Sequence, residues 1–154
     1  MQGDSEVIKL LNEVLANELT AVNQYFLHAR MQRNWGFRTL GEHTYAESID
    51  EMKHADLLIE RLLFLEGRPN VQRQNPVRIG GSVPEQFAAD LAIEVHAIEA
   101  LRRGIALCSA QTDTVTRLLL ESILSSEEGH IDYLETQLSL LQVLGESVYL
   151  SRQL

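Results

Sequence analysis

The stretch ESIDEMKHAD (residues 47–56) carries a glutamate and a histidine three positions apart, Glu51 and His54. Residues at this spacing lie on one face of an α-helix, so a single turn offers one carboxylate and one imidazole. Apolar residues recur around the pair at steps of three and four, which is typical of a helix. The pattern predicts a helix over about 37–66 that stops at Gly67.

Three further segments show the same periodicity, and each has recognisable end signals. The first helix is predicted from about Asp4 to Arg33, the third from Ser82 through Cys108, the fourth from Asp113 to Gly145, and a short fifth up to Leu154. Asp4 and Asp113 are candidate N-caps. Ser82 and Glu85 have the spacing of a capping box, with Pro84 in the first turn. The sequence therefore predicts an all-α protein.

The connections between these helices indicate the topology. Three are short, whereas residues 68–81 form a long connection marked by Asn75, Pro76, Gly80 and Gly81. A long link joins parallel helices, here expected to be neighbours, across the length of a bundle. We therefore predict a ferritin-like four-helix bundle with one crossover, forming one domain over residues 1–154. A plain up-and-down bundle with a long loop is the alternative.

Carboxylates interrupt the apolar stripes of these helices. Glu18 lies on the stripe of the first helix and Glu94 on that of the third, and the fourth repeats the Glu-x-x-His pair as Glu127 and His130. The pairs 18/94, 51/127 and 54/130 are all 76 positions apart, so the chain has the pattern of two tandem helix pairs with the same ligand set. An unpaired buried carboxylate is unfavourable, and none of these stripes supplies a lysine or arginine beside its acid, so a metal is the simplest explanation.

The donor set indicates which metal. Oxygen and nitrogen ligands without sulfur suit iron or manganese, with zinc as a competitor. Four carboxylates balance the charge of two divalent ions inside the core. A lone glutamate or a lone Glu-x-x-His pair would more simply be a solvated helix face. Six such residues in one register match the pattern of di-iron carboxylate bundles.

Composition narrows the class of partner. The formal net charge of −9 disfavours nucleic acid and anionic membranes, and it suits cations. Cys108 is the only cysteine, which excludes an internal disulfide and a thiolate cage, and we expect it to be a small core residue. We see no signal peptide and no apolar run of about 20 residues, so we expect a cytoplasmic protein with no membrane partner.

The whole chain resembles the bacterioferritins. The resemblance is carried by NELTAVNQYFLHARM (17–31), ESIDEMKHAD (47–56), IERLLFLEG (59–67) and SSEEGHIDYLETQL (125–138). It implies a shell of twenty-four subunits, built from dimers, that stores ferric mineral in its cavity. It also implies a ferroxidase site in each subunit that oxidises Fe²⁺ with oxygen or hydrogen peroxide. Carried over by position, the six ligands of its two iron ions are Glu18, Glu51, His54, Glu94, Glu127 and His130.

The resemblance also implies a haem. In bacterioferritins a methionine at the position of Met52, from each of two subunits, ligates a haem b at the dimer twofold axis. By itself an outward methionine is more simply interface packing. A small ferredoxin is the expected reductant. The residues expected to help line the haem pocket are Leu19, Phe26, Tyr45 and Ile49.

Some positions depart from the family pattern or fall outside it. Position 46 is Ala46, where some members have a histidine that forms an inner-wall iron site, although Glu47 and Asp50 remain. Position 148, near the fourfold channel, is Val148. Tyr25 lies on the ligand stripe. We expect it either to hydrogen-bond a metal ligand or donate an electron, or to be an ordinary core tyrosine. We interpret His28, His43 and His96 as surface or interface residues.

The main alternative is a different di-metal enzyme on the same bundle, such as a manganese catalase, a peroxidase or an oxygenase. One cysteine excludes the four-cysteine site of a rubrerythrin-type peroxidase. An oxygenase usually needs a longer chain. A purely structural bundle would leave six buried polar side chains unexplained.

Overall fold

The computed structural model describes all 154 residues, and every regular element in it is a helix. The helices are α1 (Ser5–Asn34), α2 (Arg38–Phe64), α3 (Val83–Ala110), α4 (Thr114–Leu144) and α5 (Glu146–Ser151). None of them combines the length and apolar character needed to cross a membrane. The predicted fold class, a four-helix bundle with a short C-terminal helix, is confirmed.

The predicted N-terminal signals are the observed caps. Asp4 accepts hydrogen bonds from the backbone amides of the first turn of α1, and Asp113 does the same for α4. Ser82 caps α3 by accepting from the amide of Glu85. The Glu85 carboxylate reaches back to the amide of Gly81 at 2.8 Å, one residue before the cap. These contacts satisfy amides that have no partner inside the helix.

The end of α2 differs from the prediction. The helix ends at Phe64, and the residue that reverses the chain is Glu66, with φ of 61°, rather than Gly67. The amide of Gly67 then bonds the carbonyl of Leu62 at 2.8 Å, which is the long hydrogen bond of a Schellman motif. Gly67 is needed for a different reason, because a Cβ there would lie 2.9 Å from the side chain of Ile8.

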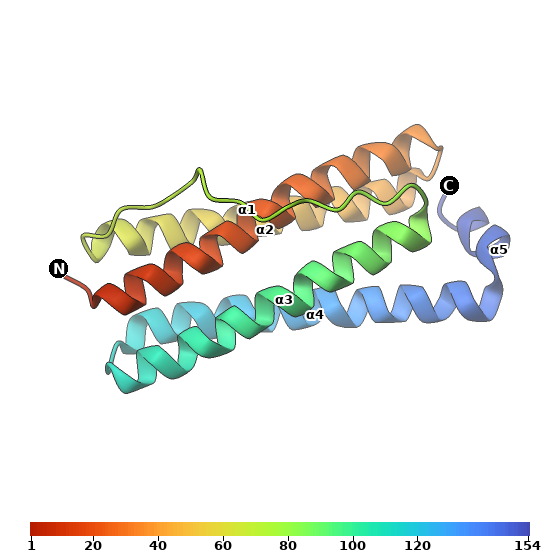
Figure 1. Cartoon of the computed structure of the whole chain (residues 1–154). Coiled ribbons are helices and arrows are strands. Elements are labelled where there is room, and N and C mark those ends of the chain that lie inside the picture. The colour runs from red at the N-terminus through yellow and green to blue at the C-terminus, as the bar shows by residue number, and fades with distance from the viewer.

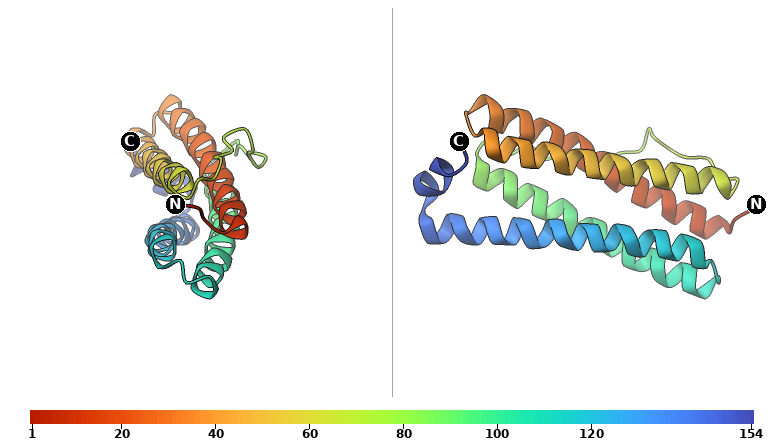
Figure 2. Two further views of the ribbon diagram at one scale, coloured as in Figure 1. Left: turned by 90° about the vertical axis from the view of Figure 1, so that its left-hand side faces the viewer. Right: turned by 180° about the vertical axis from the view of Figure 1, so that it is seen from behind.

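The four long helices form two hairpins, α1 with α2 and α3 with α4 (Figure 1). The crossover segment (residues 65–82) runs back along the whole bundle beside α1, so α2 and α3 point in the same direction (Figures 1 and 2). The parallel direction was predicted, but the two helices are not neighbours. α1 packs on α2 and α3, and α4 packs on α3 and α2, so α2 and α3 lie on a diagonal.

Two apolar clusters form the core at opposite ends of the bundle. One contains Leu11, Leu58, Leu101 and Ile123 among its members, and Cys108 is buried in it as predicted. The other contains Leu40, Phe87, Leu134, Leu141 and Tyr149, the last from α5, which closes that end (Figure 2). On α2, α3 and α4 the acids of the predicted site lie between the residues of these two clusters, and on α1 Glu18 follows Leu15 of the first cluster.

Buried polar side chains of α1 fasten the crossover segment to the bundle. Three crossover amides donate hydrogen bonds of 2.9 to 3.0 Å, from Asn75 to Thr20, from Arg78 to Gln24, and from Gly80 to His28. These bonds replace the regular backbone pairing that a segment without secondary structure lacks. The crossover is therefore an integral part of the structure around α1 and α3.

Candidate metal centre

The six predicted side chains meet in the middle of the bundle as two overlapping groups. One group contains Glu18, Glu51, His54 and Glu127, and the other contains Glu51, Glu94, Glu127 and His130. Within each group the potential ligand atoms lie within 4.8 Å of one another. Glu51 and Glu127 belong to both groups. This sharing is the arrangement expected for two cations held side by side, with two carboxylates between them.

The helices supply these groups symmetrically. α1 and α3 each contribute one glutamate, whereas α2 and α4 each contribute a Glu-x-x-His pair. The four carboxylates are almost completely buried, with Glu51 at 0% exposure. His54 and His130 lie at the edge of the cluster, where their side chains keep 13% and 10% of their exposure.

The cluster is not satisfied by its own hydrogen bonds. Nine buried side-chain atoms in the protein have no hydrogen-bond partner, and eight of them belong to these six residues. His54 Nδ1 lies 3.0 Å from Glu127 Oε1, and His130 Nδ1 lies 2.9 Å from Glu51 Oε1, but neither contact has hydrogen-bond geometry. Buried polar atoms are normally paired, so this concentration of unpaired donor atoms fits a bound metal.

The electrostatics of the metal-free cluster favour bound protons. Burial, and then the charges of Glu51 and Glu127, raise the pKa of Glu18 well above its usual range. Burial and the neighbouring Glu127 do the same to the pKa of Glu94. Four carboxylates cannot all ionise in one apolar space without a compensating positive charge.

The two histidines provide part of that charge. Burial lowers the pKa of His54, but the adjacent carboxylates of Glu127, Glu18 and Glu51 outweigh this effect and raise the pKa to about 12. Burial likewise opposes protonation of His130, and the carboxylates of Glu51 and Glu94 raise its pKa to about 11. These shifts favour bound protons in the metal-free cluster.

Tyr25 is hydrogen-bonded to Glu94, one of the residues of the cluster. Its hydroxyl donates a hydrogen bond to Oε1 of Glu94, and its side chain is completely buried. Of the two interpretations of Tyr25, the structure therefore supports contact with a candidate ligand. The other oxygen of Glu94 remains free of hydrogen bonds.

Met52 lies outside the cluster. Its side chain is 51% exposed on α2, although Glu51 beside it is fully buried. Tyr45 on the same helix packs against Phe26 of α1, with ring centroids 6.0 Å apart. Of the other residues expected to line a haem pocket, Leu19 and Ile49 are half-buried. A single chain thus presents one thioether beside a partly apolar surface.

Other predicted positions have varied outcomes. Ala46 is exposed. Glu47 is buried, and its carboxylate is hydrogen-bonded to the His43 imidazole. Asp50 is half-exposed, with its Oδ2 3.8 Å from His130 Nε2. Val148 is exposed on α5. His96 lies on the surface as predicted, and His43 is exposed while stacking on Tyr133.

The prediction for His28 is wrong. This histidine is completely buried, with Nδ1 2.9 Å from Oδ1 of Asp90 and Nε2 accepting from the amide of Gly80. Asp90 also accepts a hydrogen bond from Gln24. The sequence contained a signal for this contact, because His28 falls close to the stripe of the first helix, but its partner is 62 positions away.

Comparisons with known proteins agree with this architecture. The ferritin family model, described as a ferritin-like domain, matches residues 8–144. Bacterioferritin BfrA of Mycobacterium tuberculosis is 56% identical over 149 residues, which cover 97% of this chain and 94% of that protein. Bacterioferritin of Streptomyces coelicolor is 56% identical over 151 residues, covering 98% and 90%.

A solved structure described as Mycobacterium tuberculosis bacterioferritin, BfrA, superposes with a TM-score of 0.99. It is 54% identical and covers 100% of this chain and 97% of its own. The chain therefore belongs to the bacterioferritin family of ferritin-like proteins.

Proposed function

We propose that this protein stores iron and that each subunit oxidises two Fe²⁺ ions at the cluster of four glutamates and two histidines. The observation that carries the proposal is the concentration of unpaired buried donor atoms in two overlapping groups. Glu18 and His54 would hold one ion, and Glu94 and His130 the other. Glu51 and Glu127 would contact both ions.

The chemistry of the donor set fits iron as the substrate. Carboxylate and imidazole ligands bind Fe²⁺, and the oxygen-rich set also suits Fe³⁺, the harder product ion. Two Fe²⁺ ions held together can supply the two electrons that reduce oxygen to peroxide, or peroxide to water. The four ionised carboxylates balance the charge of two Fe²⁺ ions, so binding would replace the protons that the metal-free cluster keeps.

The side chains at the edge of the cluster would control passage. His54 and His130 retain partial exposure, whereas the carboxylates do not. Asp50 is half-exposed beside His130, outside the core, where it would bind a passing cation only weakly. The ferric product would accumulate as mineral inside a shell of twenty-four subunits assembled from dimers.

A haem b shared by two subunits completes the proposal. Met52 is half-exposed on the same helix as Tyr45, which packs against Phe26, and it would hold the haem together with Met52 of a second subunit. Two neutral sulfur ligands favour ferrous haem. Such a haem would carry electrons from a small ferredoxin to the mineral, because ferric iron must be reduced before release.

Anaerobic Fe²⁺ titration followed by rapid mixing with oxygen tests the site. We expect the fast phase to saturate near two irons per subunit and to disappear in Glu18→Ala and in Glu127→Ala. Glu128→Ala is the matched control, because Glu128 is exposed, pairs with Arg102 and is adjacent to Glu127. An unchanged fast phase in both cluster variants would refute the assignment.

Size-exclusion chromatography separates this function from the alternative di-metal enzymes. Only the storage function expects a particle of several hundred kilodaltons that retains ferric mineral after iron loading. A manganese catalase would instead decompose hydrogen peroxide rapidly when loaded with Mn²⁺ and would not accumulate iron.

A further inference from the structure

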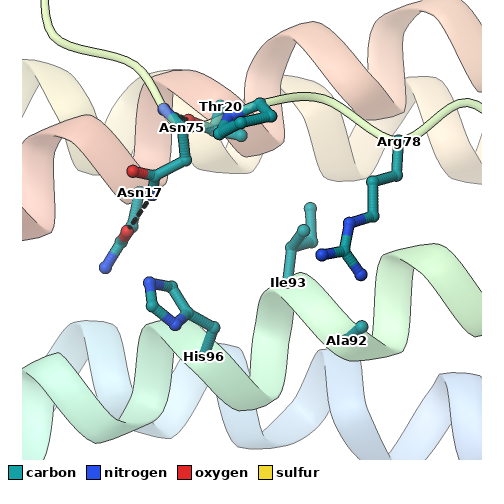
Figure 3. A pocket seen from close by; sticks show the side chains of 8 residues that line it. Asn17, Thr20, Asn75, Arg78, Ala92, Ile93 and His96 are labelled. Carbon is teal, nitrogen blue, oxygen red and sulfur yellow. Dashed lines mark hydrogen bonds between the residues drawn. The ribbon is translucent and has the colours of Figure 1, made fainter.

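A cavity of about 320 Å³ opens between α1, the crossover segment and α3 (Figure 3). None of the six residues of the candidate metal cluster lines this cavity. Asn17, which lines the cavity, precedes Glu18 in the chain, and Ile93, which also lines it, precedes Glu94. Because neighbouring helical residues point in different directions, the cavity and the cluster occupy different sides of the same two helices.

The polar side chains that line this cavity include the Arg78 guanidinium, the His96 imidazole and the carboxamides of Asn17 and Asn75. Arg78 extends from the crossover segment towards α3, and His96 extends from α3 towards Asn17, with Ile93 between them in the view of Figure 3. No carboxylate of the protein lies within 4.0 Å of the Arg78 guanidinium. None of the residues that line the cavity is an aspartate or a glutamate.

Asn17 adds a donor that has no partner. Its carboxamide oxygen accepts a hydrogen bond from Asn75 Nδ2 at 2.6 Å. Its Nδ2 is buried without a hydrogen bond, and the residue is only 6% exposed. This is the one unpaired buried polar atom in the protein that lies outside the metal cluster. A buried donor without a protein acceptor is unfavourable unless a ligand or water supplies one.

We propose that this cavity binds a tetrahedral oxyanion of the phosphate class, either inorganic phosphate or a small phosphate monoester. A guanidinium offers parallel donors that match two oxygens of a phosphate. His96 and the Asn17 carboxamide would donate to the remaining oxygens. The volume lies at the lower end of small-molecule sites, which excludes a large ligand.

The anion would connect three parts of the fold. Arg78 belongs to the crossover, His96 to α3 and Asn17 to α1. The crossover is already tied to α1 through the amides of Arg78 and Gly80, but its Arg78 side chain has no ionic partner. A bound oxyanion would neutralise that charge and reduce local opening of residues 75–80.

Calorimetric titration of the assembled, iron-free and chelator-treated protein in chloride buffer tests this proposal. Inorganic phosphate and glycerol 3-phosphate are the two probes. We expect saturable binding of one or both, with no more than one site per subunit. Arg78→Gln and His96→Ala should each weaken it about tenfold or more, because each removes donors to a charged ligand.

Arg73→Gln is the control, since Arg73 is exposed on the same segment and does not line the cavity. It should bind the anion as the wild type does. Hydrogen exchange of residues 75–80 should slow when the anion is added to the wild type. Because no iron is present, a failure of the ferroxidase assignment would leave these results unchanged.

Two outcomes would overturn the proposal. One is the absence of saturable binding for both probes, or binding that is equal in wild type, Arg78→Gln and His96→Ala. The other is His96-dependent binding of Zn²⁺ without binding of either anion, which would make the cavity a cation site.

Discussion

The hydroxyl of Tyr25 donates a hydrogen bond to Oε1 of Glu94, and both side chains are buried beside the candidate metal centre. The contact joins α1 to α3 and fixes one carboxylate oxygen while the other stays free. The hydrogen bond from Tyr25 therefore positions the Glu94 carboxylate and leaves its second oxygen available to a metal ion.

Tyr25→Phe should keep the fold but loosen Glu94. We expect the metal-free protein to lose about 1 kcal/mol of stability, the usual net value of one hydrogen bond. The affinity for one of the two divalent ions should fall, because Glu94 belongs to only one of the two groups of potential ligands, the group that contains His130. Calorimetric unfolding and anaerobic Co²⁺ titration measure these effects. Tyr133→Phe is the control, and an equal loss of Co²⁺ affinity there would contradict the prediction.

Met52→Leu should separate haem binding from iron oxidation. Leucine keeps a similar volume but removes the sulfur, and Met52 is half-exposed outside the cluster. Wild-type protein produced with adequate haem should bind about one haem per two subunits, seen by absorbance spectroscopy. The variant should keep the particle size and fast oxidation, lose the haem spectrum and release iron more slowly under reduction.

Met31→Leu is the matched control for that experiment, because the Met31 sulfur accepts a hydrogen bond from Gln86 inside the chain. It should keep the haem. If Met52→Leu retains a spectrum identical to that of the wild type, Met52 is only a packing residue.

Asp50→Ala should leave the fast phase intact and change later mineralisation only slightly. Ala46 supplies no imidazole near Asp50, so we expect this surface to bind iron weakly and the central cluster to sustain continued uptake. Stopped-flow absorbance with repeated Fe²⁺ additions measures both phases. A larger effect of Asp50→Ala than of Glu127→Ala on the later phase would show that this surface drives mineralisation.

The metal-free protein should lose stability as the pH rises above 6.5. The surrounding carboxylates raise the pKa of His54 to about 12 and that of His130 to about 11, from an ordinary value of 6.5. A raised histidine pKa contributes stability that is complete below the unfolded value and is lost as the pH rises through the folded value.

Zinc loading should reverse this trend, because a metal displaces the protons and binds more tightly as they leave. Melting temperatures between pH 6.5 and 9.5, with and without Zn²⁺, measure the difference. A metal-free melting temperature that increases steadily across this range would contradict the assigned protonation.

Glu66→Gly should stabilise the turn after α2. Glu66 has φ of 61°, a left-handed conformation that costs a side-chain-bearing residue about 1 kcal/mol and that glycine adopts freely. We expect a gain of up to about 1 kcal/mol in thermal unfolding. Glu60→Gly, in the exposed interior of α2, should instead destabilise by about the same amount. Destabilisation by Glu66→Gly would contradict this account.

The sequence by itself determined the helices of this protein and the composition of its candidate metal cluster. Helical periodicity and local caps such as Asp4, Ser82 and Asp113 depend on neighbours within one or two turns, so they can be recognised along the chain. The repeat of 76 positions extends this to the cluster, because it relates Glu18 to Glu94 and the Glu51/His54 pair to Glu127 and His130.

Tertiary structure alone decided the contacts between distant segments. The burial of His28 against Asp90 and the cavity between Asn17 and Arg78 each join residues more than fifty positions apart. The diagonal placement of α2 and α3 depends on how the two helical hairpins pack together. Glu66 adopts the left-handed position after α2, while Gly67 approaches Ile8 closely. These contacts depend on which helix surfaces meet in the folded bundle. The periodicity of one helix shows which face is buried, but it contains no information about which other helix packs against that face.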